Sequence, residues 1–156
     1  MKTMASTAAP SNFAFLQPAP GAEERVANLL WRCALQLRQR FDAALLPLGL
    51  RVRHFAVLVT LQQSGVMSQQ ALAQLTCIDP STTVALLDEL QRARLIERRR
   101  NPGDRRVHQL HITALGRQRL RQARLRAEAV ENAVLTPLTA AQRRQLKKLL
   151  AALLTA

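Results

Sequence analysis

The sequence predicts a mainly α-helical fold with one small β-hairpin. Leucine and alanine dominate the composition, and only five of the 156 residues are glycine, which favours helices. Apolar residues recur every three or four positions through most of residues 22–154, whereas segment 95–113 has the turn signal and the alternation of two short strands. A chain of this length fits one domain and is long enough to bury a core.

The chain is strongly basic. It holds 23 Lys and Arg residues against 10 Asp and Glu, which gives a formal net charge of +13, and arginine far outnumbers lysine. The guanidinium group forms paired hydrogen bonds to phosphate and is less strongly hydrated than an ammonium group. The charge therefore predicts a nucleic-acid partner. A membrane partner is not expected, because no apolar run approaches the roughly 20 residues of a spanning helix.

Enzymes, metal sites and exported proteins have sequence patterns that this chain lacks. It has three histidines, no Gly-rich phosphate loop and no nucleophile set beside a base, so we expect no enzymatic activity. Cys33 and Cys77 lie far apart without metal-ligand spacing, so we expect two buried small side chains and neither a metal nor a cofactor. Residues 3–11 are small and polar rather than a hydrophobic signal, which predicts a cytoplasmic protein.

The first helix is expected from residue 22 to about residue 46. Before it, residues 1–21 form an arm whose prolines prevent a long helix. Pro47 and Gly49 end the helix. Its apolar residues follow helical spacing and predict one apolar face: Val26, Leu30, Cys33, Leu37, Phe41 and either Ala44 or Leu45.

Three shorter helices are expected next, at 52–63, 69–76 and 80–93. Ser68 is a suitable N-cap for the second of them, and Asp79 followed by Pro80 is a strong start for the third. Only residues 77–79 separate the last two. The side chains expected to point inward are Phe55, Val57, Leu58, Leu61, Leu72, Leu75, Val84, Leu87 and either Leu90 or Gln91.

Segment 95–113 predicts a hairpin with its turn at Asn101-Pro-Gly-Asp104. The hairpin carries five arginines: Arg98, Arg99, Arg100, Arg105 and Arg106. So many cations on an exposed hairpin are expected to lie along a polyanion. Two short helices joined by a tight connection and followed by a hairpin form a winged helix-turn-helix arrangement.

Two helices are expected at the C-terminal end. The first runs from about residue 113 to 135, and its five arginines between 117 and 126 predict a solvated face, with a DNA border or a ligand cavity as alternatives. The second begins at a capping box, Thr139-Ala-Ala-Gln142. Because leucines at 146, 149, 150, 153 and 154 make this last helix strongly apolar, we expect it to pack on a partner chain.

The order of these parts resembles the MarR family of bacterial and archaeal transcription regulators. The resemblance covers about residues 25–154. It rests on four patterns. Leu48-Gly-Leu-Arg-Val-Arg-His-Phe-Ala-Val-Leu58 is similar to the family's helix entry after the first helix, and Asp79–Leu90 is similar to its recognition helix. Leu95–Arg98, Asp104-Arg-Arg106 and Leu110–Gly116 are similar to its hairpin, called the wing, and the start of the next helix, and residues 139–154 are similar to its closing helix. The spacing from Asp104-Arg-Arg106 to Thr113-x-x-Gly116 is the most specific of these patterns.

The resemblance implies a mainly α, winged helix-turn-helix fold with N- and C-terminal dimerisation helices. Residues 1–21 would be a flexible arm and residues 22–156 a single domain. Within that domain, 22–47 and 114–156 would form dimerisation helices and 52–113 the winged helix-turn-helix. The implied partners are a second copy of the chain and a pseudo-palindromic operator in double-stranded DNA.

Candidate DNA contacts fall on two helices and the wing. Many relatives carry Thr-Arg in the recognition helix and a basic residue one turn later, where this chain has Val84-Ala85 and Glu89. We therefore expect the wing to carry much of the affinity, with Asp104 orienting Arg106 into the minor groove and DNA shape adding to readout. The expected contact residues are Ser68, Gln69, Gln70, Ser81, Thr82, Thr83, Arg98, Arg100, Asp104, Arg105 and Arg106.

The function expected from the resemblance is a dimeric repressor that a small aromatic or phenolic ligand releases from DNA. Trp31, Arg38 and His54 are the candidate ligand residues, with packing roles for Trp31 and His54 as the alternative. A second possibility is a redox sensor that uses Cys33. A third is a non-specific architectural protein that binds nucleic acid through its charge alone.

Overall fold

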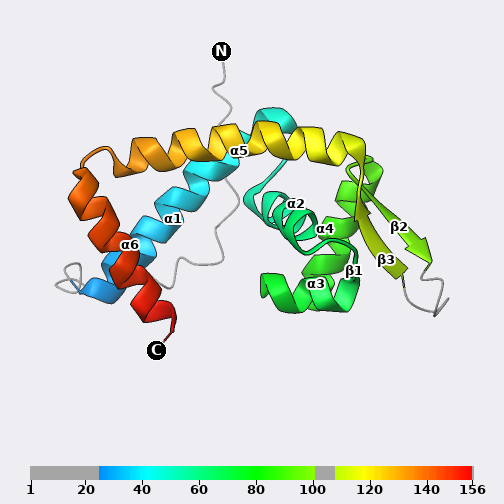
Figure 1. The fold of residues 1–156 in the computed structure, drawn as a ribbon, viewed down its shortest axis with the longest axis horizontal. Helices are drawn as coiled ribbons and strands as arrows, with labels where there is room; N and C mark the ends of the chain where they lie inside the picture. The colour runs from blue at the N-terminus through cyan, green and yellow to red at the C-terminus, as the bar shows by residue number, and fades with distance from the viewer. Residues whose placement is uncertain (1–24, 101–107, 156) are drawn as a thin grey trace, which may run out of the picture. The chain divides into compact units, whose positions relative to one another are not determined.

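The computed structural model describes residues 25–100 and 108–155. Figure 1 shows the elements, and the chain divides into two compact units, residues 1–36 and residues 37–156. The N-terminal arm and the tip of the wing, with Asp104, Arg105 and Arg106, lie outside the described residues. The elements are α1 (Val26–Leu45), η2 (Leu46–Leu48), α2 (Val52–Ser64), β1 (Met67–Ser68), α3 (Gln69–Thr76), α4 (Pro80–Arg92), β2 (Ile96–Arg100), β3 (His108–Ile112), α5 (Ala114–Leu135) and α6 (Ala140–Leu154).

The helix starts confirm the predicted caps. Asp79 accepts a hydrogen bond from the backbone N–H of Thr82 at 2.8 Å, and Pro80 occupies the first turn of α4. At α6 the capping box is complete, since Thr139 accepts from the backbone of Gln142 and the Gln142 side chain accepts from the backbone of Thr139. Local side-chain chemistry therefore sets where these helices begin.

The predicted hairpin is present, but it belongs to a three-stranded sheet. The antiparallel strands lie in the order β1-β3-β2, with Ile96 opposite Ile112 and Arg98 opposite Leu110. The sequence did not predict β1, because a strand of two residues shows no periodicity. Its residue Met67 pairs with Leu110, which joins the segment before α3 to the wing.

The core of unit 37–156 lies between α2, α3, α4, the sheet and the first half of α5. Its fully buried leucines come from each of these elements: Leu58, Leu61, Leu72, Leu87, Leu90, Leu110 and Leu120. Two predicted core positions were wrong, because Leu75 is 61% exposed and Val84 is 41% exposed. On α4 the buried stripe runs through Thr83, Leu86, Leu87 and Leu90, one position away from Val84. On the short α3, neighbouring elements cover only the stripe around Leu72.

The resemblance motif Thr113-x-x-Gly116 has a packing explanation. Thr113 donates its hydroxyl to the carbonyl of Arg94 at 2.8 Å and accepts from the backbone N–H of Gly116 at 2.9 Å. A Cβ atom on Gly116 would lie 2.0 Å from the carbonyl oxygen of Leu95, so a larger residue would push the helix away. This contact fixes the start of α5 against the segment that joins α4 to β2.

Three of the five arginines on α5 bind backbone carbonyls instead of forming only a solvated face. Arg119 donates to the carbonyl of Leu48 at 3.2 Å, and Arg126 donates to that of Ala44 at 3.3 Å. Arg117 donates to the carbonyl of Ile112 at 2.9 Å. Since cations stabilise the carbonyl end of a helix, Arg119 and Arg126 help to close the C-terminal end of α1 and η2.

No single helix in the described part of the chain is long and apolar enough to cross a membrane. Residues 26–48 and 52–64 satisfy the length and composition only when taken together, as a pair bent by 77°.

The C-terminal end of α4 places a non-glycine residue in a left-handed conformation. Arg94 has a φ of 58°. Its N–H binds the carbonyl of Gln91, and the N–H of Leu95 binds the carbonyl of Leu90, which together form a Schellman motif. Glycine is the usual residue at the position that Arg94 occupies, because a Cβ atom is disfavoured there.

Replacing Arg94 by glycine should therefore stabilise the protein. The expected gain in unfolding free energy is about 1 kcal/mol, since the left-handed conformation costs an L-residue roughly that much. Urea unfolding monitored by circular dichroism measures it. Arg94→Ala is the matched control, because it removes the same charge but keeps the Cβ atom. An equal gain in both variants would show that the charge, and not the backbone, is responsible.

Candidate nucleic-acid interface

The N-terminal turn of α4 presents polar groups at the surface. Ser81 is exposed and Thr82 is half-buried. The carboxylate of Asp79 accepts from the Ser81 hydroxyl at 2.6 Å and from the backbone N–H of Thr82. The hydrogen bonds from Ser81 and then from Thr82 hold the pKa of Asp79 well below its usual range. This turn is therefore ordered before any partner binds.

Thr83 requires a correction to the expected set of contact residues. Its side chain is buried, and its hydroxyl donates to the carbonyls of Asp79 and Ile78 at 3.0 and 3.3 Å. The hydroxyl can lie on the buried face of α4 because it donates hydrogen bonds to backbone carbonyls of the preceding turn. Thr83 is thus a core residue of this fold.

The start of α3 carries three of the expected residues. Ser68 caps the helix by accepting from the backbone N–H of Ala71 at 3.2 Å, as its sequence position predicted. Gln69 is half-buried and Gln70 is exposed. Of these three, Gln70 has the most accessible side chain for a partner.

The arginines of β2 have different surroundings. Arg98 donates to Asp88 at 2.6 Å and to Gln91 at 2.8 Å, and its side chain is only 22% exposed. It therefore connects the wing to α4, in addition to any phosphate contact. Arg99 pairs with Glu97 on the same strand, whereas Arg100 is exposed at the end of β2.

A cluster that the sequence did not predict lies where α2 meets the middle of α4. The carboxylate of Glu89 is 2.6 Å from Nη2 of Arg51 and 2.9 Å from Nε2 of His54. The backbone N–H of Arg51 donates to Nδ1 of His54 at 3.2 Å. The family resemblance placed Glu89 where many relatives carry a basic residue. Its partner Arg51, 38 positions earlier, could not be found from local spacing.

The environment of this cluster shifts two pKa values. Burial lowers the pKa of His54 below 6.5, despite the opposing charge of Glu89. Burial alone would raise the pKa of Glu89, but the hydrogen bond and charge of Arg51 outweigh it and lower this pKa. Because Nδ1 of His54 accepts from the backbone, the Nε2 of the neutral ring carries the proton, and it faces the Glu89 carboxylate at 2.9 Å.

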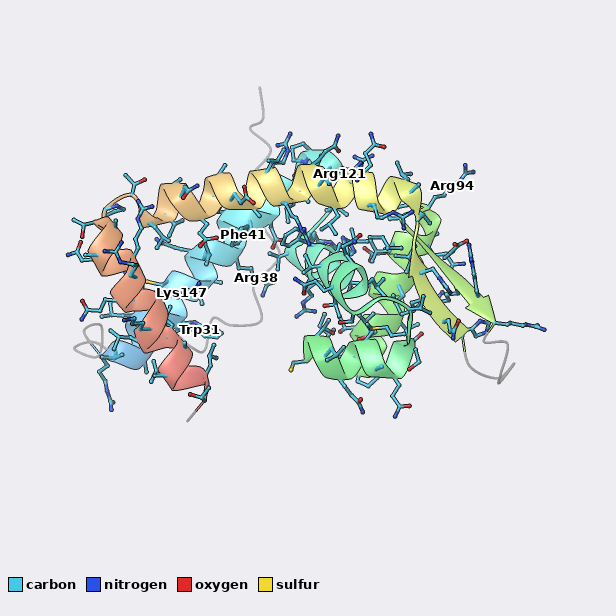
Figure 2. All side chains as sticks on the ribbon, viewed as in Figure 1. Trp31, Arg38, Phe41, Arg94, Arg121 and Lys147 are labelled. Carbon is cyan, nitrogen blue, oxygen red and sulfur yellow. The ribbon has the colours of Figure 1, made fainter. Side chains whose placement is uncertain are left out.

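A hollow of about 240 Å³ lies above this cluster, between the end of α1, the start of α2 and α4. Its charged lining consists of Arg38, Asp42, Arg51, Arg53 and Glu89. Arg38, a predicted ligand residue, lies on α1 at this hollow (Figure 2). His54 is buried beneath it, where it does not line the hollow, and Trp31 belongs to the other unit.

The cysteines are also not where the sequence placed them. Cys33 and Cys77 were expected to be buried, but both are exposed free thiols. On α1, Leu29 and Leu30 are exposed like Cys33, and Cys77 ends α3 in a left-handed conformation. Among residues 25–100 and 108–155, no group of three or more His, Cys, Asp or Glu side chains is placed to hold a metal ion.

Known proteins with similar sequences and structures include regulators with a helix-turn-helix motif. The MarR family model matches residues 50–108. The HTH-type transcriptional repressor Rv2887 of Mycobacterium tuberculosis (strain ATCC 25618 / H37Rv) is 34% identical over 122 residues, covering 78% of this chain and 88% of the repressor.

Two solved structures are similar over most of the chain. The transcriptional repressor CouR, bound to a 23-mer DNA duplex, is 29% identical with a TM-score of 0.80, covering 88% of this chain and 98% of that one. The M. tuberculosis protein Rv2887 in complex with p-aminosalicylic acid is 32% identical with a TM-score of 0.70, covering 83% of this chain and 98% of that one.

Acid should destabilise the fold through His54. Since its folded pKa lies below 6.5, its contribution to stability is present above pH 6.5 and is lost as pH falls through the folded pKa. The contribution of Glu89 to the unfolding free energy is lost only at a pH below 4.5, the ordinary pKa of a glutamate. Urea unfolding at about pH 7.5 and about pH 5.5 should give a lower unfolding free energy in acid. His54→Gln should reduce this difference, and an undiminished difference would contradict the assignment.

Proposed function

The chain belongs to the MarR family of transcriptional regulators, and on this basis we propose that it is a sequence-specific repressor that binds double-stranded DNA as a homodimer. The observation that carries the proposal is that the start of α4 and the wing belong to the same unit. The ordered, exposed start of α4 lies in the same sheet-and-helix module as an arginine-bearing wing, which Arg98 ties to α4. A helix for the major groove and cations for the phosphates are thus presented together.

The exposed apolar surface supports a homodimer. No residue of α6 is buried, and Leu149 and Leu153 are about 60% exposed. A groove of about 730 Å³ runs along α6 and the ends of α1 and α5, with Phe41 on α1 and Lys147 on α6 among its lining residues (Figure 2). A second copy would cover these side chains, and a two-fold dimer matches a pseudo-palindromic operator.

The proposed DNA contacts follow from exposure. Ser81, Thr82 and Gln70 are candidates for the major groove and its flanking phosphates. Arg100 of the described wing is available for phosphate, and Arg105 and Arg106 with Asp104 remain the proposed contacts of its tip. Thr83 is omitted because its side chain is buried.

The proposed signal is a small aromatic acid. Rv2887 has been solved with p-aminosalicylic acid, and the hollow beside α4 offers arginines that suit a carboxylate. Of the residues first considered, Arg38 lines this hollow. No specific observation favours redox sensing by Cys33. A cytoplasmic location and the lack of an enzymatic activity are part of the same proposal.

Selection of bound fragments from genomic DNA, followed by titration against random duplex, tests the proposal. A repressor of this kind should enrich one pseudo-palindromic sequence and prefer it to random duplex by at least about a thousandfold. Equal binding to both would instead indicate a non-specific architectural protein.

Arg106→Ala should weaken operator binding by about 2 kcal/mol, or about thirtyfold, because it removes a cation placed in the minor groove. Fluorescence anisotropy with the selected operator measures the change. Arg124→Ala, an exposed residue of α5, is the control for net charge and should have a much smaller effect. Unchanged affinity of the Arg106 variant, with an intact dimer by size-exclusion chromatography, would contradict this role.

Operator binding should also weaken steeply with salt. If each half of the dimer neutralises about three or four phosphates, the logarithm of the association constant should fall against log[salt] with a slope of about −6. Anisotropy titrations at several salt concentrations measure this slope. A slope near zero would contradict a phosphate-contacting wing.

A further inference from the structure

We propose that Val84, an apolar side chain on the exposed surface of α4, selects the operator by contacting the methyl group of a thymine. The inference rests on the proposed function, in which α4 enters the major groove, and it names the residue and the base that give direct readout. It also explains how a helix with so few cations can recognise a base sequence.

The N-terminal half of α4 is exposed next to the wing. Arg98 of the wing donates to Asp88 at 2.6 Å and to Gln91 at 2.8 Å, and both acceptors lie in the C-terminal half of the helix. Val84 lies one turn before Asp88 and two turns before Gln91, so it shares their face of the helix. The exposed residues of the N-terminal half are Pro80, Ser81, Val84 and Ala85. A partner that meets the start of α4 beside the wing therefore meets Val84.

The hydroxyl groups in this half of α4 already have partners. The side chains of Ser81 and Thr82 hydrogen-bond to Asp79, and Thr83 donates to backbone carbonyls in the core. A hydroxyl group has one hydrogen to donate, so none of the three can donate to a base without first giving up a bond within the fold. Recognition of guanine needs donors, because its major-groove edge carries only the acceptors N7 and O6. These hydroxyl groups are therefore poorly suited to read guanine.

The charged groups of α4 are also occupied or distant. The carboxylates of Asp88 and Glu89 pair with one arginine each, from the wing and from the N-cap of α2. Arg92, the only basic residue within α4, donates to a carbonyl of its own helix and lies about 12 Å beyond Val84 at the rise of an α-helix. Since the major groove is about 8.5 Å deep, a helix that enters it N-terminus first keeps Arg92 away from the base edges.

Methyl groups are what remains for readout from this part of α4, and thymine is the base that matches them. Val84 is 41% exposed, and valine is a weak helix former, so helix propensity does not explain its place on an exposed helix surface. Thymine alone among the DNA bases carries a methyl group, which stands on its major-groove edge. Contact between this group and the Val84 methyl groups removes apolar surface of both from water. The base beside Val84 is therefore a thymine.

The experiment removes methyl groups from the DNA and from the protein separately. In the operator obtained by selection, each thymine is replaced in turn by deoxyuridine in both half-sites, which deletes the methyl group and keeps every hydrogen-bonding group of the base. The unmodified protein is compared with Val84→Ala and with Leu125→Ala, a matched loss of exposed apolar surface on α5. Fluorescence anisotropy measures the affinities, and thermal unfolding checks that each variant is folded.

At one thymine of each half-site, deoxyuridine should weaken binding of the unmodified protein by about fifteenfold, because the dimer loses two methyl contacts that contribute about fourfold each. Val84→Ala should bind the thymine operator more weakly, and it should lose less than about twofold when that thymine is replaced. Leu125→Ala should respond as the unmodified protein does. A deoxyuridine effect that depends on Val84 is a coupling between two groups, which a general change in stability or in DNA shape would not give.

A loss on deoxyuridine substitution that persists undiminished in Val84→Ala would overturn the inference, as would an operator in which no thymine methyl group affects binding. In both cases the selected operator would still be preferred to random duplex, so the proposed function would stand. If selection enriched no sequence, the proposed function and this inference would both fail.

Discussion

The winged module depends on the close contact between the start of α5 and the segment that joins α4 to β2. Gly116 allows the two backbones to meet at a distance that a Cβ atom would prevent, and Thr113 bonds to both sides of the contact. Because β2 begins directly after this segment, at Ile96, the contact also fixes where the wing leaves the core. The Schellman motif at Arg94 and the Arg98–Asp88 pair then set the direction of β2 relative to α4. Helix, wing and α5 are in this way parts of one rigid junction.

The acids of α4 and its N-cap carry negative charge that would repel DNA, and the structure shows which groups partly neutralise them. Asp79 accepts the capping hydrogen bonds of its own helix, Asp88 pairs with Arg98 of the wing, and Glu89 pairs with Arg51, the N-cap residue of α2. Each acid therefore holds a neighbouring element in place while its field is partly neutralised.

Features that depend on neighbouring residues could be predicted from the sequence, whereas features that depend on residues far apart in the chain could not. The caps at Ser68, Asp79 and Thr139 depend on atoms within three residues, so their chemistry could be read directly. Apolar spacing located α4 but placed Val84 inside, because the exact direction of the buried face depends on which neighbours cover it. The pairing of Arg51 with Glu89 depends on how α2 packs on α4, and no spacing rule reports that. The two-residue strand β1 is defined only by its partner β3.

The order β1-β3-β2 leaves β2 at an edge of the sheet, with unpaired backbone groups along one side. Such an edge can recruit a strand from another molecule and begin aggregation. Here the edge strand ends in Arg98, Arg99 and Arg100, and two such strands side by side would place like charges against each other. The arginines of the wing therefore also oppose edge-to-edge pairing between two copies of this sheet.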